Sequence, residues 1–301
     1  MSNKDNNAKH AYLLIAHNEF ELLCKIVSLL DHEDNDIYIH IDKKSKTIPF
    51  EKIESSHKKS QLFYTDRIKV NWGGYSMIKA ELMLIQKALE KGDYQYLHLL
   101  SGVDLPLKKQ SYIHRFFADN YGKEFIHFND EQFNQKHKTR YSIYHCFQEY
   151  VGRKKTGLLY YIERALCRFQ KIINLDRSIE GVEYKGGAVW FSITEDLAKY
   201  VLENKKFIKK AFSRTTCCDE FFLQTIVYNS PFFKNVYRIQ EIPSYISCLR
   251  YVDWKRGQPY TFQDSDVDDL LNSEYLFARK FSISSEKNRK CVDTIYDRLS
   301  Y

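Results

Sequence analysis

The sequence predicts an α/β fold with a mainly parallel central sheet flanked by helices, and three segments near its start carry that prediction. A short apolar run of strand length, Ala11 to His17, is followed by Glu19 to Leu30, in which apolar residues recur at helical spacing. Asp36 to Asp42 then alternates apolar and polar residues, as a second strand does. This order of strand, helix and strand is typical of a parallel sheet, whose ligands bind at the carboxyl ends of the strands.

The elements that follow continue the alternation. Ser76 is placed to cap a helix and Gly92 to end it, and the apolar residues between them form one stripe. The stretch TTCCDEFFLQTI at 215–226 predicts another helix, with Asp219 and Glu220 in its first turn. Further strands are predicted at 94–100, 124–128 and 185–194, and further helices at 111–120 and 195–204.

Residues 136–171 are locally basic, and one helical face within them is apolar. That face carries Leu158, Leu159, Ile162, Leu166, Phe169 and Ile173. A core helix with a solvated basic side is the favoured interpretation. A helix lying on a membrane surface is the alternative.

The length and composition are those of a soluble globular protein. The chain has 301 residues, of which 44% are hydrophobic and 28% charged, and α/β folds of this length often form one domain. We therefore expect a disordered head at 1–9, a single domain at 10–285 and a C-terminal helix or tail at 286–301.

The net charge indicates which kinds of partner are favoured, and the cysteine content indicates the redox compartment. Lys and Arg total 46 against 39 for Asp and Glu, and this net +7 indicates anionic partners, although nucleic acid is disfavoured for so small an excess. The seven cysteines are an odd number without a CxxC pair, which favours a reducing compartment over a disulfide framework or a zinc site. No run approaches the roughly 18 apolar residues of a membrane span. We expect a cytoplasmic protein that touches a membrane, if at all, from outside.

Several familiar catalytic motifs are absent from the sequence. No GxxxxGK[ST], GxGxxG or GxSxG occurs, so kinases, dehydrogenases and hydrolases lose support. A sheet with ligand loops at its strand ends, carboxylates, many aromatic residues and a late basic pair fits sugar transfer from a nucleotide donor.

Many such enzymes hold the donor diphosphate through a divalent metal on an Asp-x-Asp pair. Asp-x-Asp occurs at 34–36 and, within the acidic run DSDVDD, at 264–266, and both places look like turns. The loop where a metal pair is expected offers only Asp104. Arg279 and Lys280 could neutralise a diphosphate instead. From spacing alone, a solvated basic pair is favoured for these two residues.

Eight stretches in order resemble the family of core-2/I-branching β-1,6-N-acetylglucosaminyltransferases and peptide O-xylosyltransferases, glycosyltransferase family fourteen. The resemblance extends from about His10 to Ile283 and includes no single strong motif. It implies a GT-A-type Rossmann-like fold, a UDP-sugar donor, inversion at the anomeric carbon, and no divalent metal or other cofactor. The matching stretches are AYLLIAHNEFELL, IYIHIDKKSK, VNWGGYSMIKAELMLIQKAL, YLHLLSGVDLPLK, KGGAVWFSIT with YVLEN, CCDEFFLQTI, LRYVDW and LFARKF.

The resemblance implies a role for each matching polar residue. Glu220 would be the general base, and one well-placed carboxylate suffices for a single inverting displacement. Asp219 would be its neighbour on the acceptor side, with its charge favoured by a helix dipole. Arg279 and Lys280 would bind the diphosphate and stabilise the charge that develops as the bond breaks.

The remaining implied site residues surround the donor and the acceptor. His17 and Asp42 match positions near the nucleoside, and Trp72 and Gly73 match a turn near the donor. Asp104 would contact the donor site. Trp190 would stack on a sugar ring or lie in the core, and Arg140 with Lys138 would contact the acceptor.

Departures from the family pattern bear on the substrates. Ala188-Val189 stand where the xylosyltransferases have Ser-Asp, and DEFF is nearer the branching enzymes, which favours GlcNAc over xylose. The animal members carry a membrane anchor and disulfides, and we expect neither here. A bacterial surface polysaccharide or a lipid-linked precursor, met at the inner face of a membrane, is therefore the expected acceptor.

Three alternatives remain open. The donor could be UDP-xylose or another UDP-sugar. The chain could be an inactive relative that binds sugar nucleotides or glycans without turnover. A nucleic-acid binder driven by the net charge would show steep salt dependence.

Overall fold

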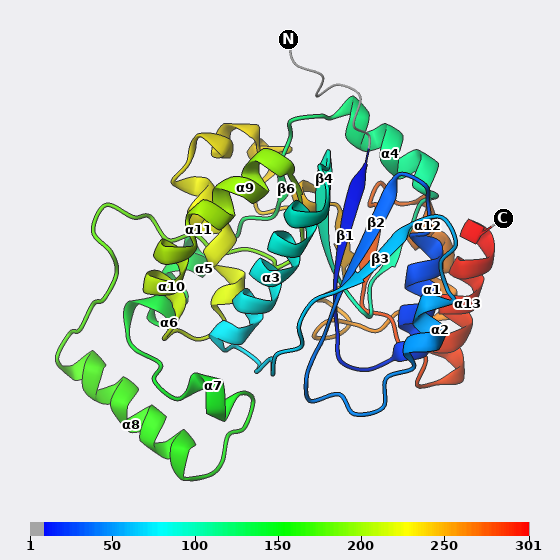
Figure 1. Ribbon diagram of the computed structural model, residues 1–301. Helices are drawn as coiled ribbons and strands as arrows, with labels where there is room; N and C mark the ends of the chain where they lie inside the picture. Colours follow the sequence, from blue (N-terminus) through cyan, green and yellow to red (C-terminus); the bar gives the residue numbers. More distant parts are fainter. Residues whose placement is uncertain (1–8, 301) are drawn as a thin grey trace.

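The computed structural model describes residues 9–300 of the chain, so the predicted head lies, apart from Lys9, outside the described residues (Figure 1). Six strands form the central sheet in the order β3-β2-β1-β4-β7-β6. The first four are parallel, and β7 runs antiparallel to both its neighbours. The predicted α/β fold with a mainly parallel sheet is confirmed. The strands are β1 (His10–Ala16), β2 (Asn35–Ile41), β3 (Gln61–Tyr64), β4 (Tyr96–Ser101), β6 (Phe125–Ile126) and β7 (Phe191–Thr194).

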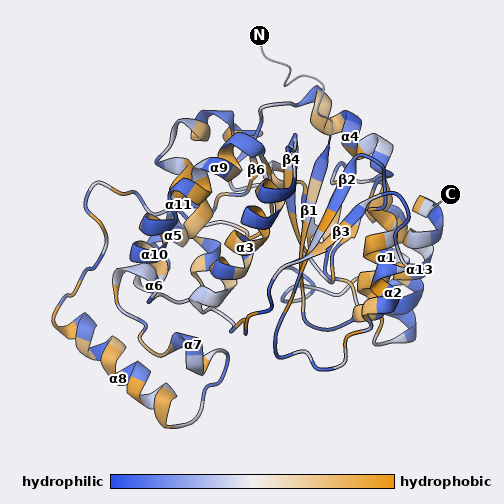
Figure 2. Cartoon of the chain, in the orientation of Figure 1, coloured by the Kyte–Doolittle hydropathy of each residue, from blue (hydrophilic) through white to orange (hydrophobic). Residues whose placement is uncertain are grey.

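Helices cover both faces of this sheet, and each face has its own core. Tyr12 and Leu14 of β1 point into one core, while Ala11 and Leu13 point into the other, as the two-residue period of a strand requires. Figure 1 shows helices on both sides of the sheet, and Figure 2 shows that these helices carry both apolar and polar residues. The first core is covered by α1 (Phe20–Leu29), α2 (Phe50–Glu54), α4 (Gln110–Asp119), α12 (Val267–Asn272) and α13 (Glu286–Ser300), and the second by α3 (Tyr75–Lys91), α9 (Glu195–Glu203), α10 (Lys205–Phe212) and α11 (Phe222–Tyr228).

A small second sheet brings the late part of the chain to the end of β4. Its strands, in the order β5-β9-β8, are β5 (Leu105–Pro106), β9 (Phe277–Arg279) and β8 (Arg250–Val252). The fully buried Arg250 guanidinium joins the two sheets, because it donates to Ser192 Oγ at 2.9 Å and to the Leu99 carbonyl at 3.3 Å. Burial lowers the pKa of Arg250 to about 10.

The segment between β6 and β7 holds four helices outside the two main layers. They are α5 (Glu131–Lys136), α6 (Thr139–Ser142), α7 (Gln148–Val151) and α8 (Leu158–Ile172). In Figure 1, α8 lies at the rim of the molecule, apart from the sheet. No helix in the described part of the chain is both long and apolar enough to cross a membrane.

The predicted core helix at 158–173 is not in the core. Leu158 and Ile172 of α8 are 76% and 77% exposed, and the buried residues of this helix are the polar Glu163 and Gln170. The expectation was wrong because an apolar helical face does not show which apolar partner covers it. On α8 the rest of the protein leaves that face uncovered.

Three local predictions also need correction. Cys218–Glu220 forms a 3-10 turn, and α11 begins only at Phe222, because Phe221 at φ −131° interrupts the helix. The strand predicted at 185–194 pairs only over Phe191–Thr194. Ser76 does not cap α3, since its hydroxyl accepts from the Asn71 amide at 2.8 Å instead.

Candidate active site

The carboxyl ends of β1, β2 and β4 meet at one edge of the sheet, and each is followed by a predicted site residue. His17 follows β1, Asp42 follows β2, and Asp104 lies in the turn after β4. Backbone hydrogen bonds draw these ends together, from the Asp42 amide to the Ala16 carbonyl at 2.9 Å and from the Gly102 amide to the Ile15 carbonyl at 2.9 Å. We call His17, Asp42, Asp104, Arg279 and Lys280 the donor edge.

Asp104 and Arg279 form the fixed part of the donor edge. Asp104 is 1% exposed and accepts from the Ser101 amide at 2.8 Å and the Ser101 hydroxyl at 2.7 Å. Its Oδ1 lies 3.8 Å from Arg279 Nε. Burial raises the pKa of Asp104, and the Arg279 charge opposes that rise. Asp104 thus contacts Arg279, and its contact with the donor stays a prediction.

Trp190 is held under the same guanidinium. The Arg279 guanidinium carbon lies 4.4 Å from the centre of the Trp190 ring, and the ring is half-buried just before β7. A sugar cannot stack on the ring face that Arg279 covers. Trp190 is thus neither a fully buried core residue nor free on both faces.

Cations gather around His17 at the other end of the donor edge. Burial lowers the pKa of His17, Asp42 raises it, and Lys44, Lys280 and Arg153 lower it further. Asp42 is itself fixed, since it accepts from the Lys44 amide at 2.9 Å and pairs with the Lys44 ammonium at 3.4 Å. The edge therefore combines a histidine with several cations, a combination suited to a nucleotide phosphate.

The Trp72-Gly73 turn links the donor edge to the turn that carries Glu220. Gly73 has φ +68°, a conformation that favours glycine, and an added Cβ would lie 3.0 Å from Cys217 Sγ. The Gly73 carbonyl accepts from the Cys217 amide at 2.9 Å. The Trp72 side chain is 47% exposed, and the Arg153 guanidinium lies 5.0 Å from the centre of its ring.

Glu220 presents an accessible carboxylate that one arginine holds in place. Its side chain is 38% exposed, and its Oε2 lies 2.5 Å from Arg140 Nη1. Its backbone carbonyl accepts from the Gly187 amide at 2.8 Å. Gly187 has no room for a side chain, because a Cβ would lie 1.8 Å from the His127 carbonyl oxygen. The KGG segment at 185–187 therefore packs against the turn that carries Glu220. Arg140, which was predicted on the acceptor side, contacts the proposed base directly.

Two carboxyl groups near Glu220, those of Asp219 and Glu81, are buried, whereas that of Glu220 is accessible. Asp219 Oδ1 is buried and has no hydrogen-bond partner among the described residues, and the same holds for both carboxyl oxygens of Glu81 on α3. Burial, and next the Glu220 charge, raise the pKa of Asp219 to about 7. Burial, and next Asp219, raise the pKa of Glu81 well above its ordinary value. Asp219 lies in a 3-10 turn that precedes α11, and not in the first turn of a helix as the sequence predicts.

The prediction from the sequence missed two aromatic residues, Tyr245 and Trp254, which contact each other near Glu220 and Arg279. Trp254 is 52% exposed, and its Nε1 donates to the Tyr245 hydroxyl at 2.8 Å. Burial raises the pKa of Tyr245 to about 12, Glu220 adds to the rise, and Arg279 opposes it. The charges of both Glu220 and Arg279 thus act on the Tyr245 hydroxyl. Trp254 belongs to the LRYVDW stretch that supports the family resemblance, but no motif singled out Tyr245.

Neither Asp-x-Asp string lies at the donor edge. Asp36 sits near the start of β2, where it pairs with Lys9 at 2.8 Å, and Asp266 pairs with Arg256 at 2.7 Å in a 3-10 turn before α12. Two surface hollows also lie apart from the edge and contain none of its residues. One is lined by Glu21, Cys24, Pro49, Lys52 and Ser56, and the other by Gln263, Asp264, Ser265, Glu286, Lys287 and Lys290.

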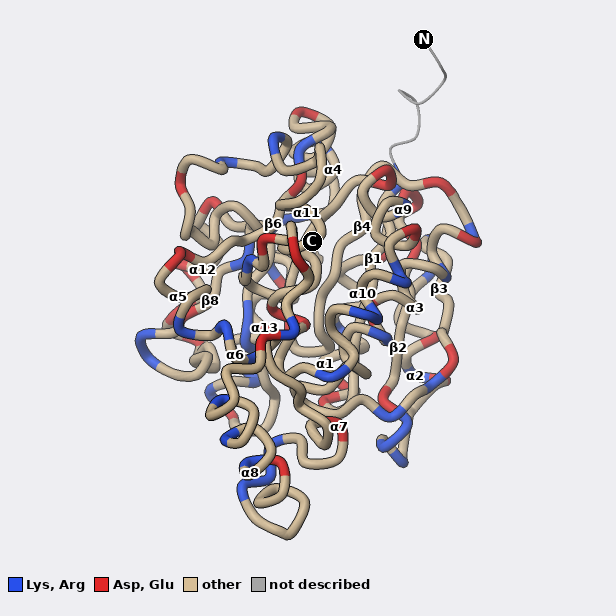
Figure 3. Tube along the Cα trace, turned by 90° about the vertical axis from the view of Figure 1, so that its left-hand side faces the viewer, with Lys and Arg blue, Asp and Glu red and all other residues tan. Residues whose placement is uncertain are grey.

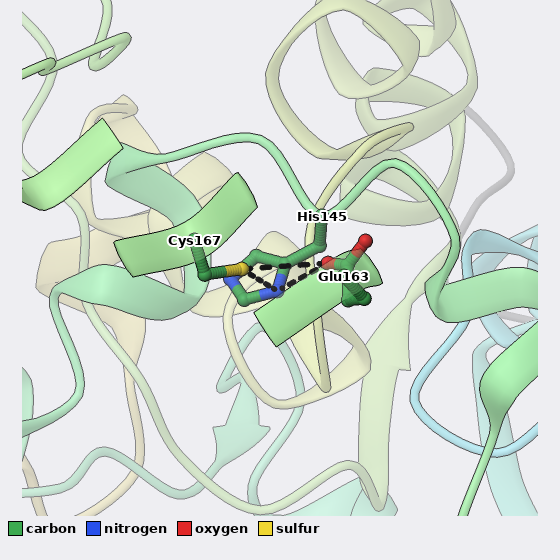
Figure 4. Close-up of side chains that lie close together, drawn as sticks. All are labelled: His145, Glu163 and Cys167. Carbon is green, nitrogen blue, oxygen red and sulfur yellow. Dashed lines mark hydrogen bonds and ion pairs between the residues drawn. The ribbon is translucent and has the colours of Figure 1, made fainter. Parts of the chain in front are cut away.

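In the described part of the chain, one group of side chains has the spacing to hold a metal ion. It is formed by two residues of α8 and one residue of the loop before α7. Donor atoms of His145, Glu163 and Cys167 lie within 4.8 Å of one another (Figure 4). His145 Nδ1 is 3.2 Å from Glu163 Oε1, and Cys167 Sγ is 3.5 Å from that oxygen. These contacts attach α8 to the loop before α7, and none of them involves the donor edge.

Known proteins similar to this chain include several xylosyltransferases. Xylosyltransferase 2 of Canis lupus familiaris is 24% identical over 291 residues, which cover 90% of this chain and 31% of that protein. Xylosyltransferase 1 of Homo sapiens is 25% identical over 296 residues, covering 92% of this chain and 29% of that protein. This chain therefore spans about a third of the length of these relatives. The apo crystal structure of mouse xyloside xylosyltransferase 1 aligns with a TM-score of 0.39 and 11% identity over 90% of this chain and 96% of that chain.

The family comparison covers most of the chain. The model that describes the Core-2/I-Branching enzyme family matches residues 10–272, from the first strand to the end of α12. This range contains every site residue named above except Arg279 and Lys280. The chain belongs to the Core-2/I-Branching enzyme family.

Proposed function

We propose that this chain is an inverting glycosyltransferase that moves GlcNAc from UDP-GlcNAc to a hydroxyl of a glycan or glycolipid. Family membership supports sugar transfer from a UDP-sugar. The observation that carries the proposal is the accessible Glu220 carboxylate, which Arg140 contacts at 2.5 Å. Glu220 as the base and Arg279 with Lys280 as the phosphate-binding cations would provide the two functions that the reaction needs.

The reaction follows from this arrangement as a single displacement. Arg140 contacts Glu220 Oε2, which leaves Oε1 for the acceptor hydroxyl. Oε1 takes the hydroxyl proton while the hydroxyl oxygen forms a bond to the anomeric carbon from the side opposite the diphosphate. The bond from that carbon to the diphosphate oxygen breaks, the electron pair leaves on UDP, and the anomeric configuration inverts.

Cations of the protein stabilise the leaving diphosphate in this proposal. Arg279 offers a planar fork of donors and Lys280 a compact charge, both suited to phosphate oxygens. Asp104 fixes Arg279 from the buried side at 3.8 Å, so the guanidinium needs no reorganisation as charge develops. Since Asp104 is committed to Ser101 and Arg279, we propose that transfer proceeds without a divalent metal.

Two sugars are candidates for the group that is transferred. The DEFF stretch at 219–222, which resembles the branching enzymes, supports GlcNAc. The curated relatives reported above are named xylosyltransferases, which supports xylose as the second candidate. The acceptor that we propose is a saccharide of a bacterial surface polysaccharide or a lipid-linked precursor, met by a cytoplasmic enzyme at the inner face of a membrane.

Release of UDP from several donors tests this function. UDP-GlcNAc, UDP-xylose, UDP-galactose and UDP-glucose are each incubated with the protein in EDTA and in Mn²⁺. Fastest release from UDP-GlcNAc, equal in both buffers, is the expected result, and fastest release from UDP-xylose would transfer the proposal to xylose. If UDP binds but no donor releases it, the chain is a sugar-nucleotide-binding relative without turnover.

A further inference from the structure

Helix α8 turns its apolar side away from the protein. The side chains of Leu158, Leu159, Tyr161, Ile162, Leu166, Phe169 and Ile172 are all exposed, and we call them the α8 apolar face. At 3.6 residues per turn they fall on one side of the helix. Figure 2 shows apolar residues along α8 where no other element covers it. A helix of an isolated soluble protein has the opposite arrangement, so a large apolar face of this kind indicates a binding surface.

The polar side of α8 holds it in this orientation. Glu163 Oε2 accepts from the Phe147 amide at 2.9 Å, and Glu163 Oε1 pairs with His145 Nδ1 at 3.2 Å (Figure 4). Gln170 accepts from the Tyr144 amide at 2.7 Å and donates to the Tyr144 carbonyl at 2.9 Å. Turning the apolar face inward would leave these buried groups without partners, so the exposure belongs to the fold.

Six cationic side chains lie beside the α8 apolar face or just before it in the sequence. Arg164, Arg168 and Lys171 lie on one flank of α8, and Arg153, Lys154 and Lys155 precede it, all of them exposed. Residues 153–173 contain one carboxylate, Glu163, which His145 already partners. Within the described residues, none of these six cations has a carboxylate at ion-pair distance. Figure 3 shows the basic positions along α8.

We propose that α8 docks this protein on an anionic lipid surface, with its apolar face between the headgroups and its cations against lipid phosphates. The charge decides between this occupant and a second copy of the chain, because two α8 helices packed face to face would bring their cations together. Each cation near an anionic leaflet is instead attracted to it. A helix of 15 residues, about 22 Å long, lies in the plane of such an interface.

This docking surface is connected to the active site. Arg153, just before α8, contacts the Trp72 ring, and Gln148 of α7 donates to the Trp72 carbonyl at 3.1 Å. Arg140, which holds Glu220, lies on the segment that leads to His145. The consequence rests on the proposed function: an enzyme docked in this way takes an acceptor saccharide carried on a lipid.

Vesicle flotation of the full chain tests the docking. Vesicles of phosphatidylcholine alone are compared with vesicles that also contain phosphatidylglycerol, at low and high salt. Wild type should float only with the anionic vesicles and less so at high salt. The triple change Leu158→Ser, Phe169→Ser and Ile172→Ser should lower the partition coefficient by about 10-fold or more, because it removes the apolar insertion.

Charge variants of two helices supply the matched control. Arg164→Gln, Arg168→Gln and Lys171→Gln on α8 should weaken flotation by about 10-fold or more, since each cation contributes to attraction by the anionic surface. Lys206→Gln, Lys209→Gln and Lys210→Gln remove the same charge from α10, a basic helix whose apolar residues Ile208 and Phe212 are buried. The α10 variant should float as wild type does.

Three results would overturn the proposal. Wild type could fail to float, the α10 variant could lose as much binding as the α8 charge variant, or sedimentation could reveal a dimer that the triple serine variant dissolves. Calorimetry with UDP on the same preparations separates this proposal from the proposed function. Loss of flotation with intact UDP binding concerns α8 alone, whereas absent UDP binding with intact flotation concerns the catalytic assignment alone.

Discussion

The donor edge and α8 both expose side chains that ordinarily need partners, and they do so in opposite ways. At the active site, charged groups are exposed but fixed by the protein, as Arg140 fixes Glu220 and Asp104 fixes Arg279. On α8 the polar groups are fixed and the apolar ones are left uncovered. The first arrangement suits a small polar ligand that must be oriented, and the second suits an extended apolar phase. Changes in one region should therefore leave the function of the other intact.

The largest separation between the two regions is expected from Glu220→Gln. Loss of the carboxylate should lower donor turnover by about 10²- to 10⁴-fold, because the amide cannot accept the hydroxyl proton. UDP binding and vesicle flotation should stay at wild-type values, as measured by calorimetry and flotation. Glu183→Gln, an exposed carboxylate away from the edge, is the control for turnover. Equal turnover in the Glu220 and Glu183 variants would remove Glu220 from the mechanism.

Replacing one leucine by alanine on each of two helices with similar apolar spacing compares a buried apolar face with an uncovered one. Leu84→Ala on α3 removes a fully buried side chain and should lower the free energy of unfolding by about 2–5 kcal/mol. Leu166→Ala on α8, where the side chain is 37% exposed, should change it by no more than about 0.5 kcal/mol. Urea titration measures both values. A loss at Leu166 equal to that at Leu84 would mean that α8 is covered by protein in solution.

The phosphate-binding role that we propose for the donor edge predicts a smaller effect. Lys280→Ala should weaken UDP binding by about 10- to 100-fold, because a charge-assisted contact contributes roughly 1.5–3 kcal/mol. Uridine binding should be much less affected, since uridine has no phosphate. Lys287→Ala on α13 is the matched exposed lysine, and it should bind UDP as wild type does. Equal weakening for UDP and uridine in Lys280→Ala would contradict the assignment.

The last prediction is a pH dependence of stability set by Asp219, the neighbour of Glu220. The pKa of Asp219 is raised from 3.8 to about 7, so the folded protein keeps a proton that the unfolded chain releases between these values. The contribution of Asp219 to stability is thus fully present below about pH 4 and is lost as the pH rises toward 7. Asp219→Asn should therefore gain on wild type by up to about 1.4 kcal/mol per pH unit across that range.

Urea titrations of both proteins at pH 4.5, 5.5 and 6.5 measure this change. The pKa of Glu124 is also raised to about 7 by burial, but that residue is present in both proteins and cancels in the difference. Asp269→Asn, at an exposed position of α12, should show no pH trend relative to wild type. A difference between Asp219→Asn and wild type that stays constant with pH would show that Asp219 is ionised throughout.

The helices α3 and α8 show how far the sequence predicts this fold. Both carry apolar residues at helical spacing, and both helices form where that spacing predicts them. The pattern does not state what covers the apolar face, because that depends on polar partners far along the chain, such as Tyr144 for Gln170. The buried position of α3 was therefore predictable, whereas the exposed position of α8 was not.

The candidate site was predicted in part for a similar reason. Residues that directly follow strands, such as His17 and Asp42, could be placed because parallel strands end at a common edge. Contacts between distant segments could not be placed, and these include the Arg140–Glu220 pair and the contacts that hold the Gly187 amide against the Glu220 carbonyl. The 3-10 turn at Glu220 was also beyond prediction, since it depends on tertiary contacts of Cys217 with Gly73.

Calorimetric titration of wild-type protein with UDP in EDTA tests the central claim most directly, namely that the cations of the donor edge form a nucleotide-diphosphate site without a metal. The account predicts saturable binding of UDP in EDTA, with an affinity that added Mn²⁺ leaves unchanged. Binding that appears only with Mn²⁺, or no binding in either buffer, would contradict it.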